Sequence, residues 1–207
     1  MKKELNGKEL AEYIMERQAK AVRGLKQQWH VNPKLAIIRT NPDPVVDSYM
    51  RIKQRYGDDV GVEVEVHTID QSEALERIAE LNNDDSVNGI IVQIPLPDKA
   101  QTAQILDSVS ISKDVDGLAS NTSFDAPTPV AINWLLTGYD VPLAGSGIVI
   151  VGNGRLVGKP LKKLWDSSGY DVVVADSKTT DLPALIAGAD ILVSAVGVPG
   201  LINADMV

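Results

Sequence analysis

The 207-residue sequence contains no cysteine, and its only histidines are His30 and His67. The absence of cysteine excludes disulfides and thiolate metal ligands. The two histidines lie in different segments and lack the spacing of metal ligands. We therefore expect no structural zinc site and no bound metal.

Long apolar runs are absent as well. The longest ones, such as residues 147–151, are far too short to cross a bilayer. The N-terminal segment MKKELNGKELAEYIMERQAKAV begins with a pair of lysines but has no apolar core, so it resembles neither a signal peptide nor a membrane span. We expect a cytoplasmic protein with no membrane partner.

The sequence also lacks an excess of positive charge, because 20 lysines and arginines face 28 aspartates and glutamates, for a formal net charge of -8. A nucleic-acid surface is normally basic, so we expect no nucleic-acid partner. The acidity is typical of a soluble protein. With 44% hydrophobic and 23% charged residues, the chain is predicted to be globular, with one large domain or two small ones.

The N-terminal half alternates between helical and extended patterns. Apolar residues near helical spacing predict an amphipathic surface helix over residues 5–28. Segments rich in β-branched residues predict strands at 34–40, 62–69 and 89–94, and helices are predicted at 45–56 and 72–81. We expect Ser72 or Asp70 to cap the second of these helices. The alternation indicates right-handed crossovers and a parallel sheet.

Residues 113–129, KDVDGLASNTSFDAPTP, interrupt this alternation with turn-forming residues. After them we expect a helix at about 130–137, strands at 148–151, 171–175 and 191–195, and helices at 156–167 and 182–187. The sequence thus predicts an α/β protein of two domains, residues 1–122 and 123–207. The second domain is expected to be Rossmann-like but truncated, because a full dinucleotide fold has about twice as many strands.

The segment GIVIVGNGRLVGKP, residues 147–160, has the strand, glycine turn and helix of a nucleotide-binding motif. Gly152 and Gly154 fill the first two places of the GxGxxG fingerprint, while Gly158 comes one residue after the expected third place. The alternative is a tight turn without a ligand. If the turn binds a nucleotide, the candidate contacts are Gly152, Asn153, Gly154, Arg155 and Gly158.

Asp176 ends the next predicted strand, near the distance at which an acidic residue binds the adenosine ribose and repels a 2′-phosphate. It could instead cap the loop SKTTD, which begins with Ser177. Lys178 and Arg155 are close in sequence and could serve a phosphate. We therefore expect Asp176 and Ser177 to contact the cofactor, and the sequence only favours NAD over NADP.

Polar residues in the first half occupy positions that suit a site. Tyr49 and Lys53 share a helix face, where a phenol can steer the proton of an amine, although a tyrosine stacked on a lysine stem would look the same. Gln93 ends an apolar strand, where ligand sites of parallel sheets form. Asp114 and Asp116 are candidates for turn formers or ligand anchors.

Together these segments match one family. The motifs Tyr49-x-x-x-Lys53, VQIPLP (92–97), KDVDG (113–117), PTP (127–129) and VGNGRLVGKP (151–160) resemble, in order and approximate spacing, the bifunctional methylenetetrahydrofolate dehydrogenase/cyclohydrolase family. LNGKELA near the start and ADILVSAVGVPGLI (189–202) are similar to it too. The resemblance covers nearly the whole chain, and KDVDG with VQIPLP is its specific part.

The resemblance implies a two-domain enzyme, usually a homodimer, with tetrahydrofolate derivatives as partners and NADP or NAD as cofactor. It implies oxidation of 5,10-methylenetetrahydrofolate to the methenyl form and hydrolysis of that product to 10-formyltetrahydrofolate. Lys53 would handle protons and polarise the folate nitrogen-carbon unit, and Gln93 would tune Lys53. Tyr49 would stack on the pterin ring, and Asp116 would hold its amino edge.

The chain also departs from the family. Gly152-Asn153-Gly154 stands where the family commonly has Gly-Arg-Ser, and Asp176 stands where histidine is frequent, which favours NAD or weak NADP binding. Val46 replaces a common serine, and the PCTP motif appears as APTP. Family members continue for roughly another eighty residues, including a PGGVGP loop. Two alternatives are therefore a folate- or nucleotide-binding remnant without hydride transfer and a related amino-acid dehydrogenase.

Overall fold

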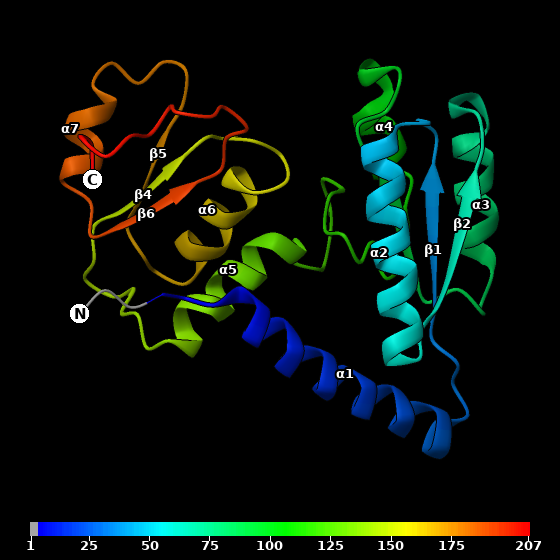
Figure 1. The fold of residues 1–207 in the computed structure, drawn as a ribbon. Helices are drawn as coiled ribbons and strands as arrows, with labels where there is room; N and C mark the ends of the chain where they lie inside the picture. Colours follow the sequence, from blue (N-terminus) through cyan, green and yellow to red (C-terminus); the bar gives the residue numbers. More distant parts are fainter. Residues whose placement is uncertain (1–3) are drawn as a thin grey trace. The chain divides into compact units, whose positions relative to one another are not determined.

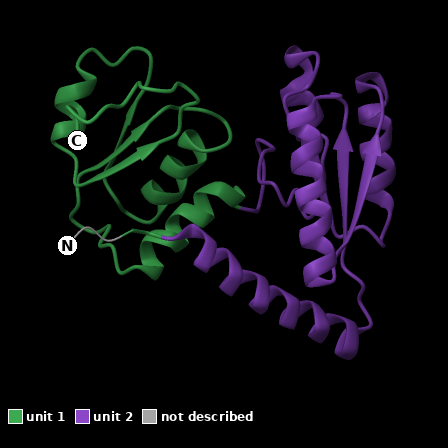
Figure 2. Ribbon diagram, viewed as in Figure 1, with its two compact units in different colours: residues 1–5, 125–207 green, residues 6–124 purple. Residues whose placement is uncertain are grey.

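The structure, a computed structural model, describes residues 4–207, which form two compact units (Figure 1, Figure 2). One unit contains residues 6–124, and the other contains residues 125–207 together with Glu4 and Leu5. The division between Phe124 and Asp125 lies slightly after the boundary expected from the sequence. Each unit has its own parallel sheet, so the predicted two-domain α/β fold is confirmed.

The first unit has a three-stranded sheet in the order β2-β1-β3, with every pair parallel. The strands are β1 (Lys34–Arg39), β2 (Glu63–Thr68) and β3 (Gly89–Gln93), close to the predicted ranges. The α-helices are α1 (Gly7–Trp29), α2 (Pro44–Val60), α3 (Ala74–Asn83) and α4 (Thr102–Asp107). Short 3₁₀ turns, η1 (Gln71–Glu73) and η2 (Lys99–Gln101), precede α3 and α4. The sequence patterns had not predicted α4.

Local signals define the ends of α2. The Asp43 carboxylate accepts hydrogen bonds from the backbone N–H groups of Val45 and Val46, and Pro44 occupies the first turn. The helix ends at Gly61, whose φ of 84° is the left-handed conformation that favours glycine. Because this stop signal follows Val60, α2 runs past the predicted end at residue 56.

Of the two predicted caps, Asp70 caps the 3₁₀ turn η1 that leads into α3, whereas the residue directly before the helix itself is Glu73. The Asp70 backbone N–H donates to the Glu73 carboxylate at 3.1 Å, which is half of a capping box. Ser72 lies inside the 3₁₀ turn η1, so the α-helix proper begins only at Ala74.

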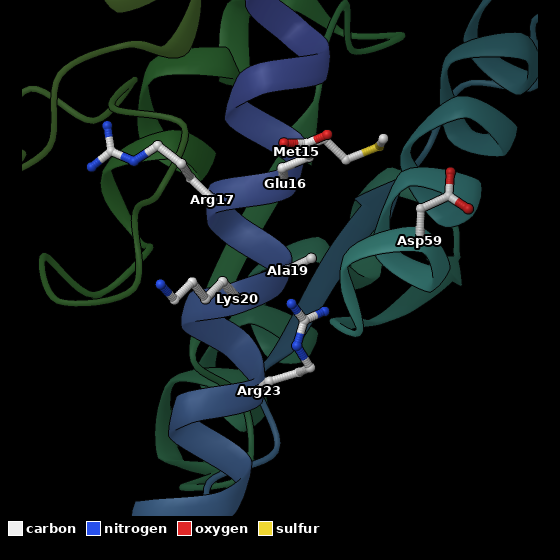
Figure 3. A pocket seen from close by; sticks show the side chains of 7 residues that line it. All are labelled: Met15, Glu16, Arg17, Ala19, Lys20, Arg23 and Asp59. Carbon is white, nitrogen blue, oxygen red and sulfur yellow. The ribbon is translucent and has the colours of Figure 1, made fainter.

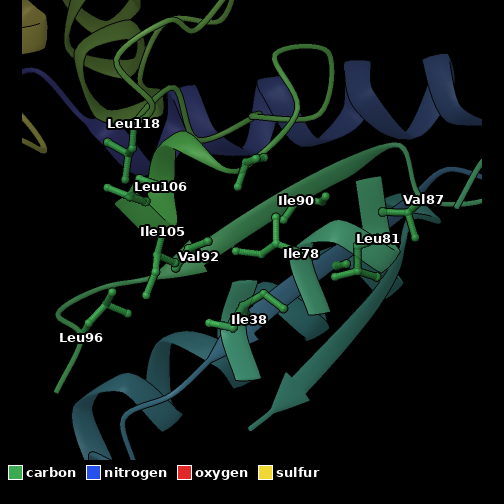
Figure 4. Close-up of a cluster of buried hydrophobic side chains, with 13 residues drawn as sticks. Ile38, Ile78, Leu81, Val87, Ile90, Val92, Leu96, Ile105, Leu106 and Leu118 are labelled. Atoms are coloured by element: carbon green, nitrogen blue, oxygen red, sulfur yellow. The ribbon is translucent and has the colours of Figure 1, made fainter. Parts of the chain in front are cut away.

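Two apolar clusters cover opposite faces of the first sheet, as the alternation of side chains along a strand requires. Ala36 and Ile38 of β1 belong to the cluster drawn in Figure 4, which also contains residues of α3 and α4. Ile37 points to the other face and packs with Val46 and Met50 of α2. The sheet therefore fixes α2 through a buried stripe that runs toward Lys53.

The second unit has a parallel sheet in the order β5-β4-β6. Its strands are β4 (Ile148–Val151), β5 (Val172–Ala175) and β6 (Ile191–Ser194), and its helices are α5 (Pro127–Gly138), α6 (Gly158–Ser167) and α7 (Leu182–Ala187). The sequence had placed the start of α6 at residue 156. The helix starts at Gly158 because the preceding residue, Val157, has non-helical backbone angles.

Trp165 of α6 is the largest fully buried side chain of this unit. Its indole N–H donates to the Asn133 side chain of α5 at 3.0 Å, so the one polar atom of the ring is satisfied. In the part of the chain that is described, no helix is both long and apolar enough to cross a membrane.

Candidate functional site

The first unit brings together three of the four predicted catalytic residues. The Lys53 ammonium on α2 donates to the Gln93 side-chain oxygen at the end of β3, with 3.0 Å between Nζ and Oε1. The Gln93 amide nitrogen donates in turn to the Ile94 carbonyl oxygen at 3.0 Å. This second bond fixes which end of the amide faces the lysine, because only the oxygen can accept.

Burial and charge act in opposite directions on Lys53. Its position on the sheet-facing side of α2 removes water from the ammonium, and this desolvation lowers the pKa of Lys53. The carboxylate of Asp116 attracts the ammonium and partly offsets that effect. Lys53 therefore holds its proton less tightly than a surface lysine.

Burial and charge also act in opposite directions on the pKa of Asp116. Burial raises the pKa of the Asp116 carboxyl, the charge of Lys53 lowers it, and the nearby charge of Asp114 raises it again. The two groups each favour the charged form of the other. Loss of either charge will therefore shift the pKa of the other group.

The structure distinguishes the two acids of KDVDG. Asp114 is only 3% exposed, and its carboxylate accepts the backbone N–H groups of Leu118 at 3.4 Å and Ala119 at 3.1 Å. Asp114 is thus the turn former of the pair. Asp116, two residues later, carries the carboxylate that acts electrostatically on Lys53.

Tyr49, the fourth predicted catalytic residue, lies one turn before Lys53 on α2 and is 56% exposed. Within the described residues no hydrogen bond joins the phenol to the lysine, so the structure does not make Tyr49 part of the same bonded cluster. Its exposed ring is instead free to contact a planar ligand by stacking.

The glycine turn of the second unit is shaped by close backbone contacts. Gly152 has a φ of 107°, and a side-chain carbon there would lie 2.7 Å from the Ala195 carbonyl oxygen. A side-chain carbon on Gly158 would lie 1.8 Å from the Gly152 carbonyl oxygen. Gly158 thus provides the close packing of helix on turn that the third glycine of the fingerprint provides.

Gly154 differs from these two glycines, because a side-chain carbon there would meet no atom within 4 Å. Its lack of a side chain leaves the backbone open to a ligand, and α6 begins after a turn at residues 155–157. The capping position of α6, Val157, offers no side-chain hydrogen bond to the first turn. A helix N-terminus of this kind attracts a phosphate group, so the residues present fit the pyrophosphate of a dinucleotide.

Asp176 lies next to this turn, because the backbone N–H of Gly152 donates to the carbonyl of Ala175 at 2.7 Å. One Asp176 carboxylate oxygen accepts the backbone N–H of Lys178 at 2.8 Å, and the Asp176 N–H donates to the Thr179 hydroxyl at 3.0 Å. Asp176 therefore does organise the SKTTD loop. That role leaves its second carboxylate oxygen available, so it does not exclude contact with a ribose.

A separate hollow of about 480 Å3 lies on α1 and α2 and contains none of the predicted site residues (Figure 3). Its lining combines cations with acids and includes Arg17, Lys20, Arg23 and Asp59. Among residues 4–207, no group of three or more histidine, aspartate or glutamate side chains is placed to hold a metal ion. The Lys53 cluster and the glycine turn are therefore the two candidate sites.

Family models match both units. Residues 5–116 match the tetrahydrofolate dehydrogenase/cyclohydrolase catalytic domain, and residues 126–207 match the NAD(P)-binding domain of the same family. The chain belongs to the tetrahydrofolate dehydrogenase/cyclohydrolase family. The resemblance inferred from the motifs is thereby confirmed.

Individual relatives agree with this assignment. The chain is 36% identical over 216 aligned positions to the bifunctional protein FolD of Lacticaseibacillus casei, covering 98% of this chain and 76% of that protein. A crystal structure of the bifunctional FolD enzyme from Campylobacter jejuni is 33% identical, with a TM-score of 0.93 over 98% of this chain and 77% of the other. A 5,10-methylenetetrahydrofolate dehydrogenase from the silkworm Bombyx mori is 27% identical, with a TM-score of 0.92 over 100% of this chain and 79% of the other.

The two glycines of the turn are predicted to respond differently to substitution. Gly158→Ala should lower the free energy of unfolding by roughly 2 kcal/mol or more, because the new methyl group collides with the Gly152 carbonyl. Gly154→Ala is the matched control and should change that free energy by less than about 0.5 kcal/mol. Urea unfolding of both variants tests this, and equal stability of the two would contradict the packing role of Gly158.

Proposed function

We propose that the chain oxidises 5,10-methylenetetrahydrofolate to 5,10-methenyltetrahydrofolate and hydrolyses the product to 10-formyltetrahydrofolate. The observation that supports this most directly is the Lys53–Gln93 hydrogen bond beside Asp116, in the unit that matches the family's catalytic domain. We further propose that the protein is cytoplasmic and acts as a homodimer, with tetrahydrofolate derivatives as its partners and without a metal.

Lys53 is the proton-handling group in this proposal. During hydrolysis, water adds to the one-carbon unit, one carbon-nitrogen bond breaks and a proton is released. A lysine with a lowered pKa has a larger neutral fraction than a surface lysine, so its Nζ can accept that proton. In its protonated form the same group polarises the folate nitrogen-carbon unit, and Gln93 holds Nζ in place for both roles.

Asp116 and Tyr49 orient the pterin ring. The partly buried Asp116 carboxylate would accept hydrogen bonds from the pterin amino edge, and burial strengthens such charge-assisted bonds. The exposed ring of Tyr49 would stack on the pterin face. Together they would hold the one-carbon unit near Lys53, since orientation of this kind is a large part of catalytic rate enhancement.

The second unit would bind the nicotinamide dinucleotide. When bound, this cofactor supplies the hydride acceptor for the oxidation. The open backbone at Gly154 and the N-terminus of α6 would receive the pyrophosphate, with Gly152, Asn153, Arg155 and Gly158 completing the turn. The protein contributes alignment to the hydride step and needs no nucleophile of its own.

We propose that the preferred cofactor is NAD. The free carboxylate oxygen of Asp176 can accept a hydrogen bond from a ribose hydroxyl, with Ser177 beside it, and its charge would repel a 2′-phosphate. Arg155 and Lys178 are the cations that could offset this repulsion. The absence of arginine at Asn153, where the family commonly has it, adds to the preference for NAD.

The first prediction from the proposed function concerns Lys53. Lys53→Met should reduce hydrolysis of methenyltetrahydrofolate by at least roughly 100-fold, because the group that accepts the proton is lost. The thermal midpoint is measured in parallel to separate loss of catalysis from loss of folding, because the substitution leaves Asp116 and the Gln93 oxygen without their partner. Hydrolysis is measured by the absorbance of the methenyl compound, and hydride transfer is measured by nicotinamide absorbance with NAD and with NADP. Lys26→Met serves as the control.

Different results would refute the proposed enzyme function and the proposed role of Lys53. A folded wild-type protein without turnover with either cofactor would refute the proposed enzyme function, and folate binding seen in the same sample would favour the binding remnant. A Lys53→Met variant as active as Lys26→Met would refute the role of Lys53 alone.

A second prediction concerns the Gln93 side chain. Gln93→Glu places a carboxylate where the amide oxygen now lies 3.0 Å from Nζ, which raises the pKa of Lys53. If neutral Lys53 accepts the proton, hydrolysis increases as pH rises through that pKa, so the rising part of the pH-rate profile should move to higher pH. Gln93→Met, which adds no charge, is the control, and an unchanged profile in Gln93→Glu would contradict this role.

A third prediction concerns Asp176. Asp176→Ser keeps a side chain able to cap the loop but removes the charge, so kcat/KM with NADP should rise at least roughly 10-fold relative to NAD. Asp171→Ser makes the same charge change just before β5, away from the glycine turn, and should leave the ratio unchanged. If kcat/KM of the wild type is higher with NADP than with NAD, the proposal that NAD is preferred is overturned.

A further inference from the structure

Lys113, the first residue of KDVDG, has two strong contacts that the sequence motifs alone do not reveal. Its ammonium donates to the carbonyl oxygens of Leu81 at 2.9 Å and Asp84 at 2.7 Å. Leu81 lies in the last turn of α3, and Asp84 follows its end. A cation is favourable here because the carbonyl groups at a helix C-terminus lack helical partners and carry partial negative charge.

The backbone of Lys113 is joined to the sheet at the same time. Its carbonyl accepts the N–H of Ile90 in β3 at 2.7 Å, and Asp114 forms a parallel bridge with Ile90. Because that bridge is parallel, the chain after Asp114 runs in the direction of β3, toward Gln93. Lys113 therefore lies where α3, β3 and the KDVDG segment meet.

Two further features restrict where Asp116 can lie. Gly89 lacks a side chain at the point where Val115 packs, since an added carbon would lie 2.9 Å from a Val115 methyl group. After Val115, the N–H of Gly117 donates to the Asp114 carbonyl at 3.1 Å and closes a tight turn that contains Asp116. The position of Asp116 is thus determined by how KDVDG is held against β3.

We propose that Lys113 is a positioning residue whose bonds to the end of α3 hold the KDVDG turn on β3 and thereby place the Asp116 carboxylate beside Lys53. This proposal rests on the proposed function of the Lys53 site, and it adds a residue that does not touch the folate. Lys113 acts through Asp116, because its own donors are directed to backbone carbonyls.

A second residue also connects α3 to the chain near KDVDG, but it bonds upstream of the motif. Asn82 joins α3 to the chain just before KDVDG, accepting the Ser110 N–H at 2.9 Å and donating to the Ser108 carbonyl at 2.8 Å. Lys113 is the link that reaches from α3 into the motif itself. Without it, the segment keeps its upstream attachment and the bonds within the turn, but the motif loses its side-chain bonds to the end of α3.

The test measures the environment of Lys53 without requiring turnover. The rate at which acetic anhydride acetylates Lys53 is followed across pH by mass spectrometry of the Lys53 peptide, since only the neutral amine reacts. Asp116→Asn should move the midpoint of this profile to lower pH and raise the reactivity below the midpoint several-fold, because the carboxylate that raises the pKa of Lys53 is gone.

Lys113→Met should move the midpoint in the same direction, and Lys113→Arg, which retains donors for both carbonyls, should restore the wild-type profile. Lys34→Met is the matched control, because Lys34 is also a partly buried lysine of this unit but pairs with Glu63 and Glu65 on β2. Lys113→Gln replaces Lys113→Met if the latter does not fold. In parallel, kcat/KM for the folate substrate should fall roughly 10- to 100-fold in Lys113→Met, as expected for a small displacement of a substrate-orienting group.

An acetylation profile of Lys113→Met that coincides with the profiles of the wild type and Lys34→Met would overturn the positioning role. An unchanged profile in Asp116→Asn would overturn it too, because Asp116 would then not act on Lys53. Absence of turnover in the wild type would instead refute the proposed function, and the acetylation profiles would still decide the role of Lys113.

Discussion

The partly buried ammonium of Lys53 is the constraint on which the rest of the first unit depends. Burial of a lysine ammonium on the sheet-facing side of a helix is unfavourable unless a hydrogen-bond acceptor and an opposite charge compensate for the lost water. Gln93 supplies the acceptor at 3.0 Å, and Asp116 supplies the charge. Gln93 lies at the end of β3, and Asp116 lies in the KDVDG turn, more than twenty residues later in the sequence. The site therefore exists only when α2, β3 and KDVDG are assembled.

The same requirement explains why three of the residues that support the site are hydrogen-bonded to the backbone. The Asp114 carboxylate stabilises the turn, and Lys113 connects that turn to α3. The Gln93 amide nitrogen donates to the Ile94 carbonyl, which fixes the orientation of the Gln93 side chain. Each supporting polar group is satisfied by the backbone. The groups that face Lys53 are thereby left with few alternative positions, which is the condition for a preorganised site.

The sequence predicted most strands and helices because each carries a strong local signal. β4 was predicted at its observed bounds, since its four consecutive β-branched residues are followed at once by glycine. By contrast, α4 has no side-chain cap at its start, whereas α7, which has the same length, begins after the Asp181 cap with a proline in its first turn. Neither Asp70 nor Ser72 directly precedes α3, because the 3₁₀ turn η1 stands before the helix and the sequence pattern did not predict that turn.

The candidate site was predictable only in part for a related reason. The resemblance to the family identified Lys53, Gln93 and Asp116, but nothing in KDVDG says that Asp114 forms the turn or where Lys113 points. Those assignments follow from the parallel bridge between Asp114 and Ile90, which joins residues far apart in sequence.

In the glycine turn, too, the sequence alone did not reveal the role of a residue. Its spacing looked irregular against the fingerprint, yet Gly158 packs against the Gly152 carbonyl as the third glycine should. What the turn requires is a close approach between two backbone segments, and the chain meets that requirement with one additional residue, since Gly158 is the first residue of α6 and packs on the Gly152 carbonyl. The spacing of glycines is therefore a consequence of where the helix starts, and geometry at the backbone decides whether a variant motif can bind a dinucleotide.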